Sequence, residues 1–107
     1  MTLYGLKSCD TCRKALAALR DAGHEVHFVD VRADGIDDAT RARFIAAFGP
    51  AIVNTRSTTW RGLTAEEQAE EPADQLAAHP TLMKRPVVEA DGRLHLGWGK
   101  DVQAELL

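Results

Sequence analysis

Cys9 and Cys12, separated by two residues, are the side chains of this sequence that could do redox chemistry. A thiolate rather than a thiol attacks disulfides and oxidised sulfur, so a working cysteine needs a lowered pKa. The start of a helix lowers the pKa of a cysteine, because unpaired N–H groups and the helix dipole stabilise the anion. We predict a helix that begins at Asp10 or Thr11, which makes Cys9 the exposed attacking thiol. Cys12 lies one turn further along, within disulfide reach, and is the expected resolving thiol.

Other interpretations of the cysteine pair are open. Both cysteines could be ordinary buried side chains, and the basic residues around them could be a solvated face. The order Cys9-x2-Cys12 and then His24-x2-His27 also imitates a zinc-finger ligand pattern. Finger histidines share one helical face, whereas these two straddle the expected exit of a helix into a strand. We therefore expect no bound metal, and we favour redox chemistry because C-x-x-C near a strand–helix junction is typical of thiol oxidoreductases.

A strand–helix–strand unit should position the two cysteines. Residues 2–5 are typical of a short strand stopped by glycine. From residue 10 or 11 to residue 22, apolar side chains recur at spacings of three and four, which predicts an amphipathic helix that ends at Gly23. Residues 25–31 alternate polar and apolar, as a half-buried strand does. A helical crossover of this length joins two parallel strands through a right-handed connection.

The middle of the chain is predicted to be helical. Asp37 can cap a helix that runs through Phe48, and Thr64 to Glu67 fits a capping box that opens a short acidic helix. Another helix is expected from Pro72 or Ala73 to Ala78. The segment 54–62 between these helices reads as polar and irregular.

A hairpin and a helix are predicted to close the chain. Residues 86–90 and 93–97 read as two strands joined by the turn Asp91-Gly92, and residues 101–107 read as a final helix. The order βαβ, then helices, then ββα indicates an α/β fold. It would consist of one mixed four-stranded sheet covered by helices, with the middle helices as an insertion.

Length and composition limit the class of protein. The 107 residues suffice for one domain spanning residues 1–107, and 13 basic against 16 acidic residues give a net charge of −3. That balance disfavours nucleic-acid binding, and no apolar run is long enough to cross a membrane. Residues 1–5 do not resemble a signal peptide, and two cysteines are too few for a secreted disulfide scaffold. We expect a cytoplasmic monomer.

Motifs along essentially the whole chain resemble the ArsC/Spx family of thioredoxin-like proteins. The first is SCDTCRKA at residues 8–15, which follows a strand. The next are NTRSTTWR at residues 54–61 and HPTLMKRPVV at residues 79–88, and Gly97-Trp98 then precedes the last helix. Taken together, the first two motifs resemble the YffB-like branch, described as glutathione-dependent thiol reductases.

The resemblance implies a thioredoxin-like fold of the form βαβ–helical insertion–ββα, with the insertion at about residues 37–79. It implies that the Arg85-Pro86 peptide is cis and lies beside the reactive cysteine. Cys9 would be the nucleophile. Arg56 and Arg85 would line an anion pocket that holds a thiolate or an oxyanion, a task that suits guanidinium because of its permanent charge and forked donors.

Further site residues follow from the same resemblance. Lys7 and Ser8, in the loop before Cys9, and Pro86 are expected to contact the substrate together with Arg56 and Arg85. Cys12 would share the catalytic role of Cys9.

Three functions, and a fold without activity, are open at this point. The leading hypothesis is a glutathione-dependent thiol–disulfide oxidoreductase that holds no bound cofactor and has glutathione or a thiol redox protein as its partner. The Cys9–Cys12 pair resembles that of the Spx regulators, which suggests a redox-sensing protein that binds RNA polymerase. An arsenate reductase is the third possibility, although residues 96–98 lack the third arginine that such enzymes carry on the last hairpin. A thioredoxin-like domain without activity is the fourth, because fold does not imply function.

Overall fold

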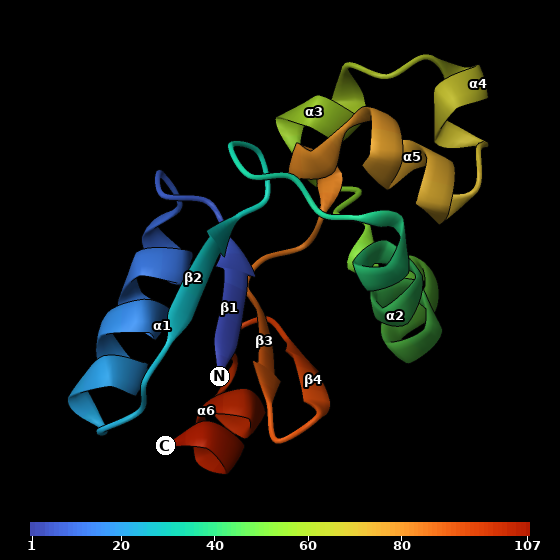
Figure 1. The fold of residues 1–107 in the computed structure, drawn as a ribbon. Helices are drawn as coiled ribbons and strands as arrows, with labels where there is room; N and C mark the ends of the chain where they lie inside the picture. The colour runs from blue at the N-terminus through green and yellow to red at the C-terminus, as the bar shows by residue number, and fades with distance from the viewer. The chain divides into compact units, whose positions relative to one another are not determined.

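A mixed sheet of four strands, in the order β2-β1-β3-β4, organises the two ends of the chain (Figure 1). The computed structural model describes all residues from 1 to 107. Strand β1 pairs in parallel with β2 and antiparallel with β3, which pairs antiparallel with β4. The strands are β1 (Thr2–Gly5), β2 (His27–Asp30), β3 (Val87–Ala90) and β4 (Arg93–Leu96). This arrangement confirms the predicted α/β class and mixed four-stranded sheet.

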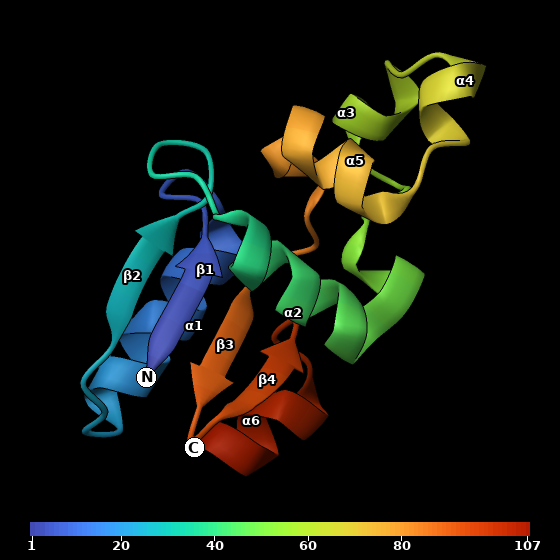
Figure 2. The same cartoon turned by 45° about the vertical axis from the view of Figure 1, so that its right-hand side comes forward.

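Two helices pack on the sheet: α1 (Asp10–Asp21) and α6 (Lys100–Leu106). The turned view places α1 behind β1 and β2 (Figure 2). The two helices and strands β1 and β3 share one apolar core, whose burial supplies most of the driving force for this packing. Its buried members are Leu3, Cys12, Ala15, Leu19, Val88, Ala90, Val102 and Leu106.

The boundaries of these elements follow from local sequence signals. Helix α1 begins at Asp10, as predicted, and Gly23 follows it with a φ of 94° that favours glycine. The hairpin turn at Asp91 and Gly92 has positive φ at both residues, which is the geometry that a two-residue hairpin loop needs. Strand β2 is shorter than the predicted segment 25–31, because only residues 27–30 of that segment pair with β1.

The chain forms two compact units. The first consists of Met1–Asp34 and Arg85–Leu107 and contains the sheet, and the second is the inserted segment Gly35–Lys84. The insertion is therefore slightly longer than the predicted range of about 37–79. One domain over residues 1–107 stays a prediction. None of the helices combines the length and the apolar character needed to cross a bilayer.

The second unit is helical, as predicted. Asp37 caps α2 by accepting the N–H of Thr40 at 2.7 Å. The short helix α3 was not predicted; Ser57 caps it by accepting the N–H of Trp60 at 3.1 Å. The helices are α2 (Asp38–Phe48), α3 (Thr58–Arg61), α4 (Ala65–Gln68) and α5 (Pro72–Ala78), with 3-10 turns η1 (Gly49–Ile52) and η2 (Pro80–Leu82).

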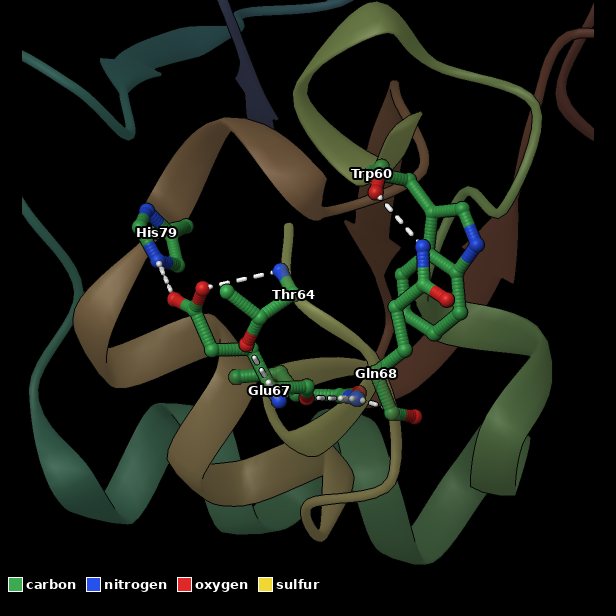
Figure 3. Close-up of polar contacts among 6 residues, drawn as sticks. Trp60, Thr64, Glu67, Gln68 and His79 are labelled. Atoms are coloured by element: carbon green, nitrogen blue, oxygen red, sulfur yellow. Dashed lines mark hydrogen bonds and ion pairs between the residues drawn. The ribbon is translucent and has the colours of Figure 1, made fainter. Parts of the chain in front are cut away.

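Polar contacts join the short helices of the second unit (Figure 3). Thr64 and Glu67 form the predicted capping box, and the Glu67 carboxylate also lies 3.3 Å from His79 Nε2. The Gln68 side chain donates to the Trp60 carbonyl at 3.0 Å. Buried Gln75 donates to the carbonyls of Glu67 and Gln68, at 3.0 and 3.1 Å. These bonds satisfy backbone groups that four-residue helices leave unpaired.

Candidate active site

Cys9 lies where the loop after β1 enters α1. It is the N-cap residue of the helix, with extended backbone (φ −86°, ψ 118°), and its carbonyl accepts the N–H of Arg13 at 3.0 Å. Its own N–H donates to the Leu6 carbonyl at 3.0 Å, which closes the loop into a tight turn. The half-buried thiol is thus held at the helix start, where unpaired N–H groups favour an anion.

The surroundings of Cys9 lower its pKa. Burial raises the pKa of the thiol, but hydrogen bonds from the backbone N–H and the side chain of Cys12 oppose it. A hydrogen bond from the Arg85 guanidinium, and its positive charge, act in the same direction. Together these donors outweigh the burial, so the pKa of Cys9 lies below its ordinary value.

Cys12 has the opposite environment. Its side chain is fully buried in the core of the sheet unit, and burial is the main cause that raises the pKa of its thiol to about 12. The adjacent Cys9 raises the pKa further, while Arg85 lowers it. Both thiols are free and reduced. One member of the pair is therefore suited to exist as a thiolate, and the other holds its proton and donates a hydrogen bond.

Gly5, the last residue of β1, makes room for the buried thiol. A Cβ atom at this position would lie 2.6 Å from Cys12 Sγ, closer than such atoms approach without a shift, and 3.0 Å from Cys12 Cβ, which is also a tight contact. Sequence reasoning treated Gly5 only as the end of a strand. A glycine seven residues before a buried cysteine has no sequence signal of its own, because the contact arises from packing.

Arg85 and Pro86 come from the segment that leads into β3. Their peptide bond is cis, which confirms the expectation from the resemblance. Pro86 is fully buried, and its carbonyl accepts the N–H of Gly97 at 2.8 Å. The first unit thus brings Cys9, Cys12 and Arg85 together.

The loop residues Lys7 and Ser8 are exposed and adjoin two open hollows. One hollow, of about 380 Å³, is bounded by both residues and by Asp30 and Arg32. The other, of about 280 Å³, runs beside α1. Its lining combines three cations with two apolar side chains: Lys7, Arg13, Arg20, Leu16 and Phe28.

Arg56 belongs to the second unit. Its N–H donates to Asn54 Oδ1 at 3.1 Å, and its exposed side chain borders a hollow of about 580 Å³ that Lys84 also lines. Two basic residues therefore line this hollow. The expected place of Arg56 beside Cys9 stays a prediction.

Sequence reasoning missed Asp30, the last residue of β2. This carboxylate is buried, with 6% of the residue exposed, and it accepts the N–H of Lys7 in the cysteine loop at 3.0 Å. The available signal was an acidic residue at the end of a predicted strand. That signal is weak, because many such residues simply face solvent.

The zinc alternative finds no support in the geometry. The structure contains no group of three or more histidine, cysteine or acidic side chains arranged to hold a metal ion. His24 Nε2 lies instead 2.8 Å from the Leu106 carbonyl, so this ring connects the end of α1 to α6.

Comparison with known proteins identifies the family of this chain. The sequence pattern of the ArsC family matches residues 4–106. The chain belongs to the ArsC family. Similarity over nearly its whole length extends to an uncharacterized protein of Haemophilus influenzae, which is 41% identical across 97% of this chain and 96% of the relative.

Two further relatives represent the branches named by the resemblance. A solved structure of a YFFB protein superposes on this ArsC-family chain with a TM-score of 0.90 and 34% identity, covering 99% of this chain and 97% of that one. The global transcriptional regulator Spx of Bacillus subtilis is 30% identical over 94% of this chain and 82% of its own. The fold is thus the thioredoxin-like fold of the ArsC family, as predicted, and the closeness to YffB-like proteins is confirmed. The relatives of this chain thus include a transcriptional regulator and a protein of Brucella melitensis described as related to arsenate reductase.

Proposed function

We propose that this protein is a thiol–disulfide oxidoreductase that uses glutathione as co-substrate. The observation that carries the proposal is the position of Cys9 at the start of α1, where the Cys12 N–H and Arg85 lower the pKa of its thiol. A lowered pKa increases the thiolate fraction near neutral pH, and the thiolate is the species that attacks sulfur.

The proposed first step is attack of the Cys9 thiolate on one sulfur of a disulfide that contains glutathione. A new S–S bond joins Cys9 to that sulfur, the old S–S bond breaks, and the other sulfur leaves as a thiolate that takes a proton from water. Arg85 stabilises the attacking anion before this step. Arg56, Lys7, Ser8 and Pro86 are the remaining proposed contacts of the substrate.

The second step releases the product. Cys12 can attack the Cys9 sulfur of the mixed disulfide, in which case glutathione leaves as a thiol. Alternatively, a second glutathione attacks the glutathione sulfur, so that glutathione disulfide leaves and Cys9 is released as a thiolate. Attack by Cys12 leaves a Cys9–Cys12 disulfide and needs the proton of Cys12 to pass to the departing sulfur or to water. The high pKa of Cys12 makes its attack slow while it stays buried, because few Cys12 side chains are ionised at neutral pH.

The hollow beside α1 supports glutathione as the partner. Glutathione has two carboxylates, and the hollow offers the cations of Lys7, Arg13 and Arg20 around an apolar floor. Arg13 also pairs with Asp10, and the Arg20 side chain donates to the Val26 carbonyl at 3.2 Å. Those contacts orient both guanidinium groups without neutralising Lys7, which follows β1 and precedes the reactive cysteine.

Mass spectrometry after exposure to glutathione disulfide tests the roles of both cysteines. In Cys12→Ser, we expect a glutathione adduct on Cys9 that persists, because the internal thiol that would displace it is gone. In the wild-type protein we expect the adduct to give way to a Cys9–Cys12 disulfide. Absence of any adduct on Cys9 in the variant would rule out the first step.

A redox-sensing regulator is the second candidate, favoured by the 30% identity to Spx and by the Cys9–Cys12 pair. In that case the disulfide would control binding to RNA polymerase, and turnover of thiols would be absent. Retention of purified polymerase on the immobilised protein, compared under reducing and oxidising conditions, separates the two functions. Redox-dependent retention without turnover of glutathione disulfide would favour the regulator.

A further inference from the structure

Asp30 is a buried carboxylate that holds the cysteine loop from the end of the neighbouring strand. We propose that Asp30 is a positioning residue for Cys9: its carboxylate fixes the loop so that the thiol meets the donors that ionise it. This inference rests on the proposed function, because it concerns the same sulfur. It adds a residue from β2 that the resemblance does not point to.

The two oxygens of Asp30 serve different segments. Oδ2 accepts the N–H of Lys7, in the loop between β1 and α1, at 3.0 Å. Oδ1 accepts the N–H groups of Arg32 and Ala33, in the turn after β2, each at 2.9 Å. One side chain therefore connects the cysteine loop to a turn that lies more than twenty residues away in sequence.

The loop has little freedom once this connection is made. Residues 6–9 separate β1 from α1, and the Cys9 N–H already donates to the Leu6 carbonyl. The Val31 N–H donates to the Gly5 carbonyl at 2.9 Å, so the end of β1 is also fixed to the end of β2. With Lys7 held by Asp30, hydrogen bonds fix the backbone of the loop at Gly5, Lys7 and Cys9.

An ionised carboxylate is the side chain that suits this task. It has two oxygens and no N–H, whereas the amide of asparagine has one oxygen and would present an N–H to a donor. The N–H of Lys7 is the largest of the influences that keep the pKa of Asp30 below its ordinary value, and Ala33, Arg32 and the Lys7 charge add to it against burial. Asp34 faces Asp30 through a different bond, in which its Oδ2 accepts the Asp30 N–H at 3.1 Å.

Because Asp30 is negatively charged, the direction in which its replacement shifts the pKa of Cys9 tests the proposal. A carboxylate in this part of the molecule disfavours a second anion, so removal of its charge alone would lower the pKa of Cys9. Loss of loop position would instead separate the thiol from Cys12 and Arg85, its stabilising groups, and raise that pKa. A structural bystander and a positioning residue therefore predict shifts in opposite directions.

The experiment measures the rate of iodoacetamide alkylation of Cys9 against pH, in wild type, Asp30→Asn and Asp34→Asn. Asp34→Asn is the matched control: it removes one charge from the same turn, but its single remaining oxygen can still accept the Asp30 N–H. We expect Asp30→Asn to raise the apparent pKa of Cys9 by about one unit, equivalent to roughly tenfold slower alkylation at pH well below that pKa. The control should leave the pKa unchanged or slightly lower.

An unchanged or lowered pKa in Asp30→Asn would overturn the positioning role while leaving the proposed function intact. A wild-type pKa at or above the free-thiol value of about 8.5 would instead remove the activation on which the proposed function rests. If Asp30→Asn does not fold, hydrogen exchange of the wild-type protein decides. The Lys7 amide should be protected although its side chain is exposed, and rapid exchange at that amide would overturn the proposal.

Discussion

Cys9 at the N-cap of α1 and Cys12 in its first turn differ in chemistry because of what surrounds each sulfur. Cys9 sits at the helix start, half-buried, with N–H donors and a guanidinium that lower its pKa. Cys12 is sealed in the apolar core, and burial raises the pKa of its thiol to about 12. This difference in dielectric and hydrogen bonding is the physical basis for the proposed roles of Cys9 as attacking thiol and Cys12 as resolving thiol.

Arg85→Ala should raise the pKa of Cys9, because it removes both a hydrogen bond and a positive charge from the thiolate. We expect a shift of about one unit, the lower end of the range for an opposite charge in contact. The measurement is again alkylation against pH. Arg93→Ala is a suitable control, because it removes an exposed arginine from β4 of the same unit. Equal shifts in the two variants would mean that only the net charge matters, and not the contact.

The sequence predicted part of the site at the residue scale. Cys9 and Cys12 stand out because C-x-x-C at a strand–helix junction is a local pattern, and Arg85 followed from the resemblance. Asp30 and Gly5 were not recognised as parts of the site, because their contacts with Lys7 and Cys12 arise only when separate elements pack together. Such contacts depend on strand register and on how deeply each side chain is buried, and the residues next to it in the sequence do not indicate either.

At the scale of elements, local capping signals predicted helix starts well. Asp37 and Thr64 accept the N–H bonds expected of N-caps, and Gly23 ends α1 with positive φ. The short helix α3 escaped prediction because four residues show no apolar periodicity. Its N-cap, Ser57, is a residue type that is also common in turns and loops, so Ser57 alone did not indicate the start of a helix.

Gly5→Ala tests the close packing of β1 on α1. The added Cβ would collide with Cys12 Sγ, and we expect a loss of about 1–3 kcal/mol in the free energy of unfolding, measured with urea. In a Cys12→Ala background the loss should shrink, because the sulfur is gone and only the contacts with the Cβ of residue 12 and with Leu3 Cδ2 remain. Gly62→Ala is the matched control. It lies after α3 with φ −80°, and its new Cβ would make ordinary contacts at 3.6 Å. A loss of similar size in the control would contradict the steric explanation.

At the scale of the whole molecule, the buried thiol of Cys12 should make the stability of the reduced protein depend on alkaline pH. The pKa of Cys12 is about 12 in the folded state against 9.0 for an ordinary cysteine. Between these values the unfolded chain releases a proton that the folded chain keeps, so stability is full below pH 9 and declines as pH rises. The slope is up to about 1.4 kcal/mol per pH unit.

Urea unfolding of the reduced protein between pH 9 and 11 measures this dependence. Cys12→Ala should flatten the decline, whatever its effect on absolute stability. Cys9→Ala should retain most of the decline, because the pKa of Cys9 is lowered and its contribution lies at lower pH. Parallel curves for wild type and Cys12→Ala would show that the Cys12 thiol ionises alike in the folded and the unfolded state, and would contradict a raised pKa in the folded protein.

The sequence also predicted the arrangement of the whole chain, in which a helical segment interrupts a mixed sheet. That was possible because strand–helix–strand and hairpin patterns are separated by purely helical signals.

The last hairpin bears on the choice of substrate. Gly97 has a φ of 83°, which a residue with a side chain rarely adopts, so an arginine at that position would be strained. Residues 96–98 therefore lack the third arginine that arsenate reductases of the family carry on this hairpin, and we expect arsenate to be a poor substrate.

The central strand β1 pairs with β2, which follows it soon in the sequence, and with β3, which comes only after the inserted helices. During synthesis, residues 1–34 emerge with the second edge of β1 still open, and Arg85 has not yet been made. Cys9 on such a growing chain lacks the Arg85 guanidinium, which helps the Cys12 hydrogen bonds to lower the pKa of its thiol. The contribution of Arg85 to the low pKa of this thiol therefore becomes available only after the inserted segment has been synthesised.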